Sequence, residues 1–123
     1  MSVPFRAAVE RADLAAMTAA LHPEVVFRSP VSFQPFRRRE AVSHLLGIIL
    51  EVFEDFRYTD ELAGEGCAAL VFEARVGTRD VHGVDLLWFD DDGLIRDFAV
   101  MVRPLSATMA VAEAVGARLG RTG

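Results

Sequence analysis

The sequence predicts one α+β domain in which an antiparallel sheet carries its helices on one side. Apolar residues recur at helical spacing up to residue 54, alternate with a period of two after Asp55, and return to helical spacing after Pro104. The chain has 123 residues, which suits a single domain 1–123 and leaves no room for a second.

Two helices should begin the chain. Ser2 can cap the first, Pro4 is tolerated in its first turn, and Asp13 can cap the second. Pro23 should end the second helix, because the residue before a proline disfavours helical conformation. The apolar faces of the two helices consist of Phe5, Ala8, Val9 and Ala12, and of Ala16, Met17, Ala20 and Leu21.

A short strand at 25–28 should end before Pro30, and the segment 30–39 reads as a loop that holds three arginines. The segment 40–54 is the clearest helix of the sequence, because its apolar residues form one broad stripe. This stripe consists of Ala41, Leu45, Ile48, Ile49, Val52 and Phe53.

Four strands should follow, at 56–63, 67–76, 81–90 and 94–103, with a hairpin turn at 91–93. Both faces of the third of these strands are largely apolar, so both must be covered. Helices can cover one face, and a second subunit is the simplest cover for the other. Ser106 can cap the final helix and Gly120 can end it, with Met109, Ala112, Val115 and Leu119 on one face.

The composition excludes several classes of protein. Hydrophobic residues make up 52% of the chain and charged residues 25%, which favours a packed core over disorder. The formal net charge of −5 argues against nucleic-acid binding. Cys67 is the single cysteine, which rules out an internal disulfide and favours a reduced compartment. The longest strongly apolar run is 45–50, far short of a membrane span, so we expect a cytoplasmic protein without a membrane partner.

The stretch from Asp85 to Arg96, which continues to Val102-Arg103-Pro104-Leu105, resembles the closing hairpin of SnoaL-like members of the nuclear transport factor 2-like superfamily. The earlier segments 13–14, 21–27 and 29–31 match the same layout, so the resemblance covers nearly the whole chain. It implies a strongly curved, cone-shaped sheet with helices over its concave face, and a homodimer that forms through the outer sheet face. It specifies fold more than function, because this fold hosts isomerases, cyclases, hydrolases and non-enzymatic members.

Ketosteroid isomerase is the catalytic template with which the chain can be compared residue by residue. Ser29, before Pro30, stands where that family has an aspartate base, and Phe5 stands where it has a tyrosine. Only Asp85 matches the protonated aspartic acid of the long strand. Since a serine without an activating base cannot remove a carbon-bound proton and a phenylalanine donates no hydrogen bond, the usual isomerase reaction is not expected.

Asp85 is therefore the candidate catalytic residue. An apolar wall disfavours its ionised form, and the neutral acid can donate a hydrogen bond to a carbonyl oxygen or serve in acid–base chemistry. The alternative is that Asp85 pairs with an arginine such as Arg28 or Arg75, or faces solvent.

Asp97 is the second carboxylate to consider, and its position depends on strand register. If Asp85 opposes Phe98, Asp97 points to the other face; a slip of one residue would bring the two carboxylates together. His44 reads as a boundary residue of its helix, and His82 falls on the face opposite Asp85. No metal-ligand spacing occurs, and the run of aspartates before Gly93 reads as a turn.

The sequence thus predicts a cofactor-independent pocket protein that binds an apolar, ring-containing small molecule. As an enzyme it would act by general acid–base chemistry, as an isomerase, cyclase or hydrolase; the alternative is a non-catalytic binding or dimeric assembly module. The pocket residues expected beside Asp85 are Phe5, Val9, Met17, Phe27, Ser29, Leu45, Ile49, Phe53, Leu87, Phe98 and Val100.

Overall fold

A computed structural model describes residues 3–122 and confirms the predicted α+β class. Helices and strands follow the expected order along the chain. The elements are α1 (Pro4–Glu10), α2 (Leu14–Ala19), β1 (Leu21–Arg28), β2 (Phe36–Arg37), α3 (Arg39–Val52), β3 (Glu54–Gly64), β4 (Cys67–Val76), β5 (Arg79–Phe89), β6 (Ile95–Arg103) and α4 (Leu105–Thr122).

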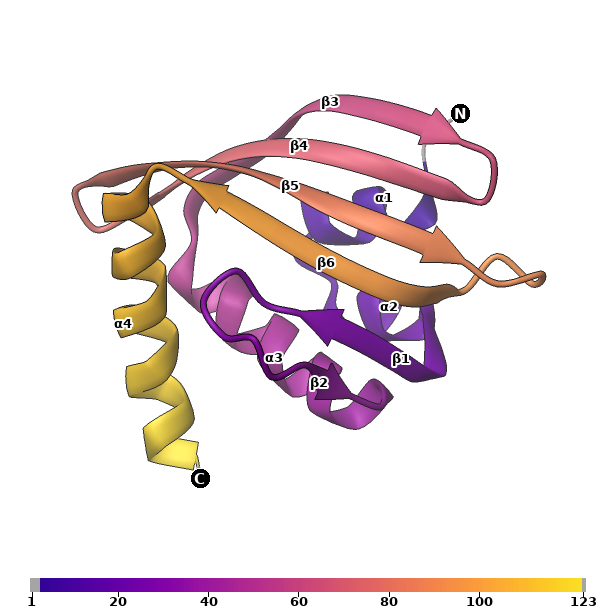
Figure 1. Cartoon of the computed structure of the whole chain (residues 1–123), viewed down its shortest axis with the longest axis horizontal. Helices are drawn as coiled ribbons and strands as arrows, with labels where there is room; N and C mark the ends of the chain where they lie inside the picture. The colour runs from indigo at the N-terminus through magenta and orange to yellow at the C-terminus, as the bar shows by residue number, and fades with distance from the viewer. Residues whose placement is uncertain (1–2, 123) are drawn as a thin grey trace.

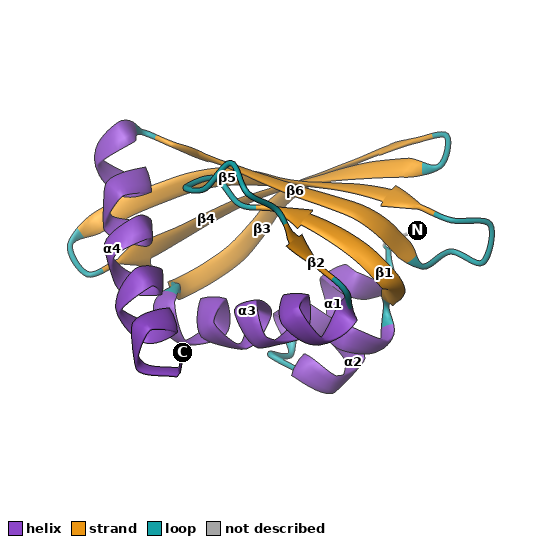
Figure 2. Cartoon of the chain, turned by 60° about the horizontal axis from the view of Figure 1, so that its bottom comes forward, coloured by secondary structure: helices purple, strands orange, loops and turns teal. Residues whose placement is uncertain are grey.

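The six strands form one mixed sheet in the order β2-β1-β6-β5-β4-β3. Strand β1 runs parallel to β6, and the other neighbouring pairs are antiparallel. The sheet is strongly bent, with α1, α2 and α3 below its concave face and α4 across one end (Figures 1 and 2). This is the predicted cone, in which the inner sheet face and the helices enclose a common interior. None of the described helices is long and apolar enough to cross a membrane.

The start of the sheet differs from the prediction. Helix α2 ends at Ala19, with Asp13 as its cap, and Pro23 lies inside β1 rather than at a helix end. Leu21 and Val25 are completely buried, so packing of this segment into the sheet decides its conformation. Pairing with β6 is irregular between Leu21 and Val26, which is where a residue without an N–H is tolerated. Strand β2 lies in the segment predicted as loop.

The two long helices also differ from the prediction at their ends. Helix α3 ends at Val52, and Glu54 already belongs to β3. In α4, Ser106 lies inside the helix and Gly120 does not end it. Its buried face consists of Ala107, Val111 and Val115, whereas Met109, predicted on that face, is 64% exposed. The proposed cap Ser2 lies outside the described residues.

The hairpin register places Asp85 opposite Val100, not opposite Phe98 as one alternative assumed. Asp97 pairs with Trp88 on the outer face, where its Oδ1 accepts a hydrogen bond from Arg28 Nη1 at 3.0 Å. Asp85 lies on the inner face, so the two aspartates do not form a carboxylate pair.

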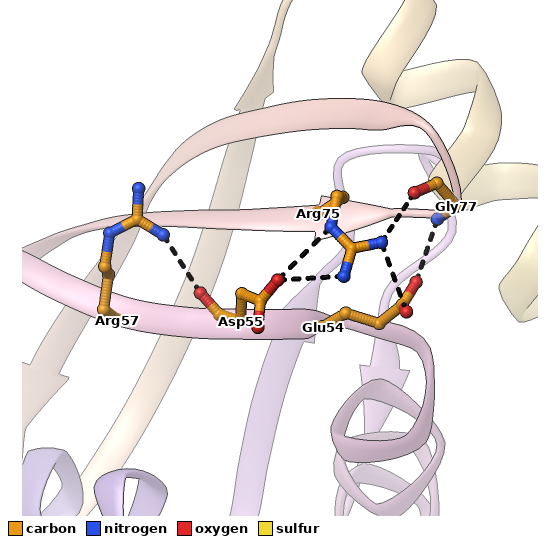
Figure 3. Close-up of polar contacts among 5 residues, drawn as sticks. All are labelled: Glu54, Asp55, Arg57, Arg75 and Gly77. Carbon is orange, nitrogen blue, oxygen red and sulfur yellow. Dashed lines mark hydrogen bonds and ion pairs between the residues drawn. The ribbon is translucent and has the colours of Figure 1, made fainter.

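A charged cluster fixes the beginning of β3 against the end of β4 (Figure 3). Arg75 Nη2 lies 2.8 Å from Asp55 Oδ2, and Arg75 Nη1 lies 3.3 Å from Glu54 Oε1. Arg57 donates to the backbone oxygen of Asp55 at 3.1 Å. The cluster matters for the interior because β3 is irregular here, with Asp55 at a φ of 53°, and the next inward residues are Phe56 and Tyr58.

Candidate functional site

The interior of the cone contains a cavity of about 270 Å³ between the concave face of the sheet and the helices. Its wall is mostly apolar and receives side chains from every helix and from five of the six strands. The lining consists of Phe5, Val9, Glu10, Ala12, Met17, Phe27, Ser29, Pro30, Val31, Leu45, Leu46, Ile49, Leu50, Phe53, Phe56, Tyr58, Phe72, Asp85, Phe98, Val100, Val111 and Val115.

Every side chain that the sequence suggested for the pocket belongs to this lining except Leu87. Leu87 lies on the same face of β5 as Asp85, but it is completely buried opposite Ala68 and Phe98. It therefore packs the core beside the cavity and does not line it.

Asp85 is the one charged residue among the described residues that is buried, with 6% of its surface exposed. Its position follows from the alternation of β5, in which residues 81, 83, 85 and 87 all face the interior. Gly83 assists, because a side chain there would collide with the ring of Phe72. The missing side chain lets this ring cover β5 two residues before Asp85.

The hydroxyl of Tyr58 donates a hydrogen bond to Asp85 Oδ2 at 2.8 Å, which joins β3 to β5 across β4. No arginine contacts Asp85 in residues 3–122: Arg28 pairs with Asp97, and Arg75 pairs with Asp55 and Glu54. Every fully buried side-chain oxygen and nitrogen of the described residues has a partner, whereas no protein donor there reaches Asp85 Oδ1, so Oδ1 is not fully buried. Oδ1 is therefore the oxygen that a ligand in the cavity can reach.

Burial raises the pKa of Asp85 from its ordinary 3.8 to about 7, although the hydrogen bond from Tyr58 acts in the opposite direction. Burial and the neighbouring Asp85 carboxyl raise the pKa of Tyr58 far above its ordinary value. Tyr58 therefore remains a protonated donor, while Asp85 exchanges its proton near neutral pH. This is the pKa range in which a general acid or base is most effective.

Helix α1 is fastened to β3 above this pair. Arg6 Nη1 lies 3.1 Å from Glu61 Oε1, and the backbone nitrogen of Val3 donates to Glu61 Oε2 at 3.1 Å. The guanidinium of Arg6 also lies 5.7 Å from the centre of the Tyr58 ring, within range of a cation–π interaction. These contacts hold Phe5 and Val9 of α1 in the cavity wall.

The exposed members of the lining mark where the cavity reaches solvent. Glu10 is the last residue of α1, Ala12 lies in the turn after it, and Val31 lies in the loop after β1. Ser29 accepts a hydrogen bond from the backbone nitrogen of Val31 at 3.1 Å, so its hydroxyl helps to shape this loop. The mouth is therefore polar on one side and the floor carries Asp85 and Tyr58.

The remaining sequence candidates lie away from the cavity. His44 is exposed on α3. His82 lies on the outer sheet face, where its Nδ1 contacts Arg103 Nη1 at 3.3 Å. No group of residues that could hold a metal ion occurs among the described residues.

Tyr58 is the buried polar site residue that the sequence reasoning missed, and the neighbouring rings of Phe56 and Phe72 were missed with it. Tyr58 is the single tyrosine of the chain, and it follows Phe56 at the spacing that puts both on one strand face. That alternation was the available signal. What could not be inferred was that β3 and β5 lie close enough for a hydroxyl to reach a carboxylate two strands away.

Comparisons with known proteins give the same fold and include closely similar sequences. The family model described as SnoaL-like domain matches residues 4–98. A crystal structure of a steroid delta-isomerase from Pseudomonas aeruginosa is 44% identical, with a TM-score of 0.90, over 94% of this chain and 86% of that one. No match was found among curated proteins.

Two further crystal structures resemble this chain. A bacterial protein with a cystatin-like fold from Silicibacter pomeroyi is 33% identical, with a TM-score of 0.89, over 94% of this chain and 82% of that one. A nuclear transport factor 2-like protein from Mesorhizobium loti is 20% identical, with a TM-score of 0.72, over 81% and 85% of the two chains. The second likeness bears on fold alone.

Proposed function

The chain belongs to the SnoaL-like domain family, and on that basis we propose that it is a cofactor-independent enzyme that acts on an apolar, ring-containing carbonyl compound. In this proposal Asp85 is the general acid. Its protonated carboxyl donates from Oδ1 to the carbonyl oxygen of the ligand, and Tyr58 holds Oδ2.

One observation carries the proposal: a carboxyl group without a cationic partner in residues 3–122 lies on the floor of an apolar cavity, where burial raises its pKa to about 7. In such surroundings a hydrogen bond to a developing oxyanion is stronger than in water. Transfer of a proton to a carbonyl oxygen is shared by enolisation, isomerisation and aldol cyclisation. In the isomerisation, solvent water at the mouth takes the proton from the α-carbon as Asp85 protonates the carbonyl oxygen. The resulting dienol then takes a proton at the γ-carbon and returns its hydroxyl proton to Asp85. The 44% identical steroid delta-isomerase supports an isomerase among these classes.

The ketosteroid isomerase template still matches incompletely. Ser29 is engaged in its own loop, and Phe5 offers an aromatic ring without a donor. Tyr58 supplies a hydroxyl from a different strand, and that hydroxyl is directed at Asp85 itself. The proposal therefore assigns the acid to Asp85 and gives Ser29 no part in proton removal.

The test uses a β,γ-unsaturated cyclic ketone, whose conversion to the conjugated isomer is followed by ultraviolet absorption. We expect turnover by the wild type that declines as the pH rises through about 7, because the acid must be protonated. Asp85→Asn should lose about a hundredfold or more in rate, within the range for loss of a general acid. Asp97→Asn, a change of the same chemistry on the outer face, should keep the wild-type rate.

A rate that rises through pH 7 would give Asp85 the role of base and contradict this assignment. Equal rates for the wild type and Asp85→Asn would favour the second candidate, a non-catalytic ligand-binding module. That candidate has one specific observation behind it. The other carboxylate of the described lining, Glu10, is exposed and paired with Arg6 at 3.3 Å, so the buried wall holds no second acid–base group.

A further inference from the structure

The dimensions of the cavity restrict its ligand more than the family does. We infer that the site accepts a flat two-ring ketone rather than a four-ring steroid, an inference that rests on the proposed function. An apolar cavity of about 150 Å³ binds benzene. The cavity of this chain, about 270 Å³, is a little less than twice that size, which suits two fused rings.

The wall cannot readily yield to a larger ligand, because its side chains pack against one another. Phe56 and Phe72 stack with their ring centres 4.9 Å apart, and Phe5 meets Phe98 edge to face at 5.2 Å. Leu45 and Leu46, which lie on the α3 side, are each 3% exposed. Extra ring atoms within the wall would push these side chains from their preferred rotamers, which is costly in a well-packed interior. Rings that instead project through the mouth would lie beside the exposed Glu10 carboxylate and bury little apolar surface.

The aromatic lining also favours a ring over a flexible chain. One group of rings, Phe53, Phe56, Tyr58 and Phe72, lies beside Asp85, and Phe5, Phe27 and Phe98 form another group in the same wall. Aromatic side chains gain most from contact with another flat ring. An open chain of equal size would also lose rotational freedom when bound.

Polar groups are distributed so that one ligand oxygen finds a partner. Asp85 and Tyr58 are the buried polar members of the lining, while Glu10 lies at the exposed mouth. A single carbonyl directed at Asp85 is satisfied, whereas a second polar group deep in the wall would be left without a hydrogen bond. The ligand should therefore carry its oxygen at one end and an apolar second ring at the other.

The experiment measures binding of four probes to the full chain by calorimetry: cyclohexanone, 2-tetralone, 2-decanone and a four-ring 3-ketosteroid. We expect 2-tetralone to bind most tightly. Cyclohexanone has four carbons fewer and buries less apolar surface, so at about fourfold for each missing carbon it should bind more than about a hundredfold more weakly. 2-Decanone has the same number of carbons as 2-tetralone but should bind about tenfold more weakly, because it loses rotational freedom. The steroid should also bind about tenfold more weakly, because it overfills the cavity.

A matched pair of variants tests the size limit from the other direction. Ile49→Ala enlarges the cavity at a half-buried position of the lining, so steroid affinity should rise several-fold while 2-tetralone affinity falls. Leu62→Ala, at a side chain that is 63% exposed on β3, should change neither affinity. Circular dichroism and thermal melting are the checks that both variants fold.

The outcomes separate this inference from the proposed function. If the steroid binds as tightly as 2-tetralone, if 2-decanone does, or if 2-tetralone does not bind, the two-ring inference is wrong. The proposed function is tested separately by pH: ketone affinity should fall above about pH 7 in the wild type and stay constant in Asp85→Asn. The expected ranking without that pH dependence would support the ligand shape and contradict the acid role of Asp85.

Discussion

Replacing Asp85 with asparagine should change how the stability of the protein depends on pH. The folded chain holds the Asp85 proton up to a pKa of about 7, whereas the unfolded chain releases it near 3.8. Between these values unfolding releases a proton, so the free energy of unfolding of the wild type falls as the pH rises. Below the lower value and above the higher one this contribution is constant. Asparagine does not titrate, so the variant lacks this dependence.

The size of the effect follows from the two pKa values. The difference between 3.8 and about 7 corresponds to about 4 kcal/mol over the whole range, at about 1.4 kcal/mol per pH unit. About 3 kcal/mol of this lies between about pH 5 and 8.5, where acid unfolding of the rest of the chain does not interfere. The free energy of unfolding of Asp85→Asn minus that of the wild type should therefore rise by about 3 kcal/mol as the pH increases across that interval.

Urea unfolding followed by circular dichroism at both pH values measures this difference. The wild type and the variant share every other titrating group, so the comparison cancels those contributions. Asp97→Asn is the control, because the Asp97 carboxylate lies on the outer face in an exposed pair with Arg28. For this variant, the difference from the wild type in free energy of unfolding should change by less than about 1 kcal/mol between the two pH values. If the difference between Asp85→Asn and the wild type in free energy of unfolding changes as little with pH as it does for Asp97→Asn, the burial argument is refuted.

Four further substitutions test the surroundings of Asp85, helix α4 and the outer face. Tyr58→Phe removes a hydrogen bond that lowers the Asp85 pKa, so the decline of the pH–rate profile should move to higher pH; an unchanged midpoint would contradict this. Gly83→Ala would bring a methyl group to 2.8 Å from the backbone oxygen of Met101 and against the Phe72 ring, so thermal unfolding should show a loss of about 1–3 kcal/mol. Gly116→Ala, which meets nothing within 4 Å on α4, should instead stabilise the chain slightly. We also propose that a second copy covers the outer sheet face, where Trp88 is 42% and Met101 58% exposed. Light scattering should show a dimer for the wild type and a monomer for Met101→Glu. A monomeric wild type would contradict this proposal.

Local patterns were sufficient to predict most of the fold. The alternation in 67–76 predicts β4 with its observed bounds, and the apolar stripe of 40–54 predicts α3 within two residues at its end. The predictions failed where burial in the sheet outweighs local preference. Pro23 lies within a strand because Leu21 and Val25 must be buried, and Met109 faces solvent because α4 turns Ala107 and Val111 inward.

The site was predictable to a different extent. An aspartate flanked by apolar residues on a strand of strict alternation indicates an unusual carboxyl group, and Asp85 is the buried charge of the described residues. Its partner required knowledge of three-dimensional distance. Residues 58 and 85 lie on strands separated by β4, and the irregular pairing near Asp55 shifts the register on which that contact depends. Leu87 shows the converse limit, because alternation identifies a face of the sheet but not the extent of a cavity along it.

The most direct test is a carbon-13 NMR titration of the Asp85 side-chain carboxyl, assigned by its loss in Asp85→Asn. A carboxyl held in an apolar hollow with one tyrosine donor should change its shift with a midpoint near pH 7, as expected from a pKa of about 7. A midpoint near 4, the value of a solvated aspartate, would show that water or a cation reaches this group and would remove the physical basis for its role as an acid.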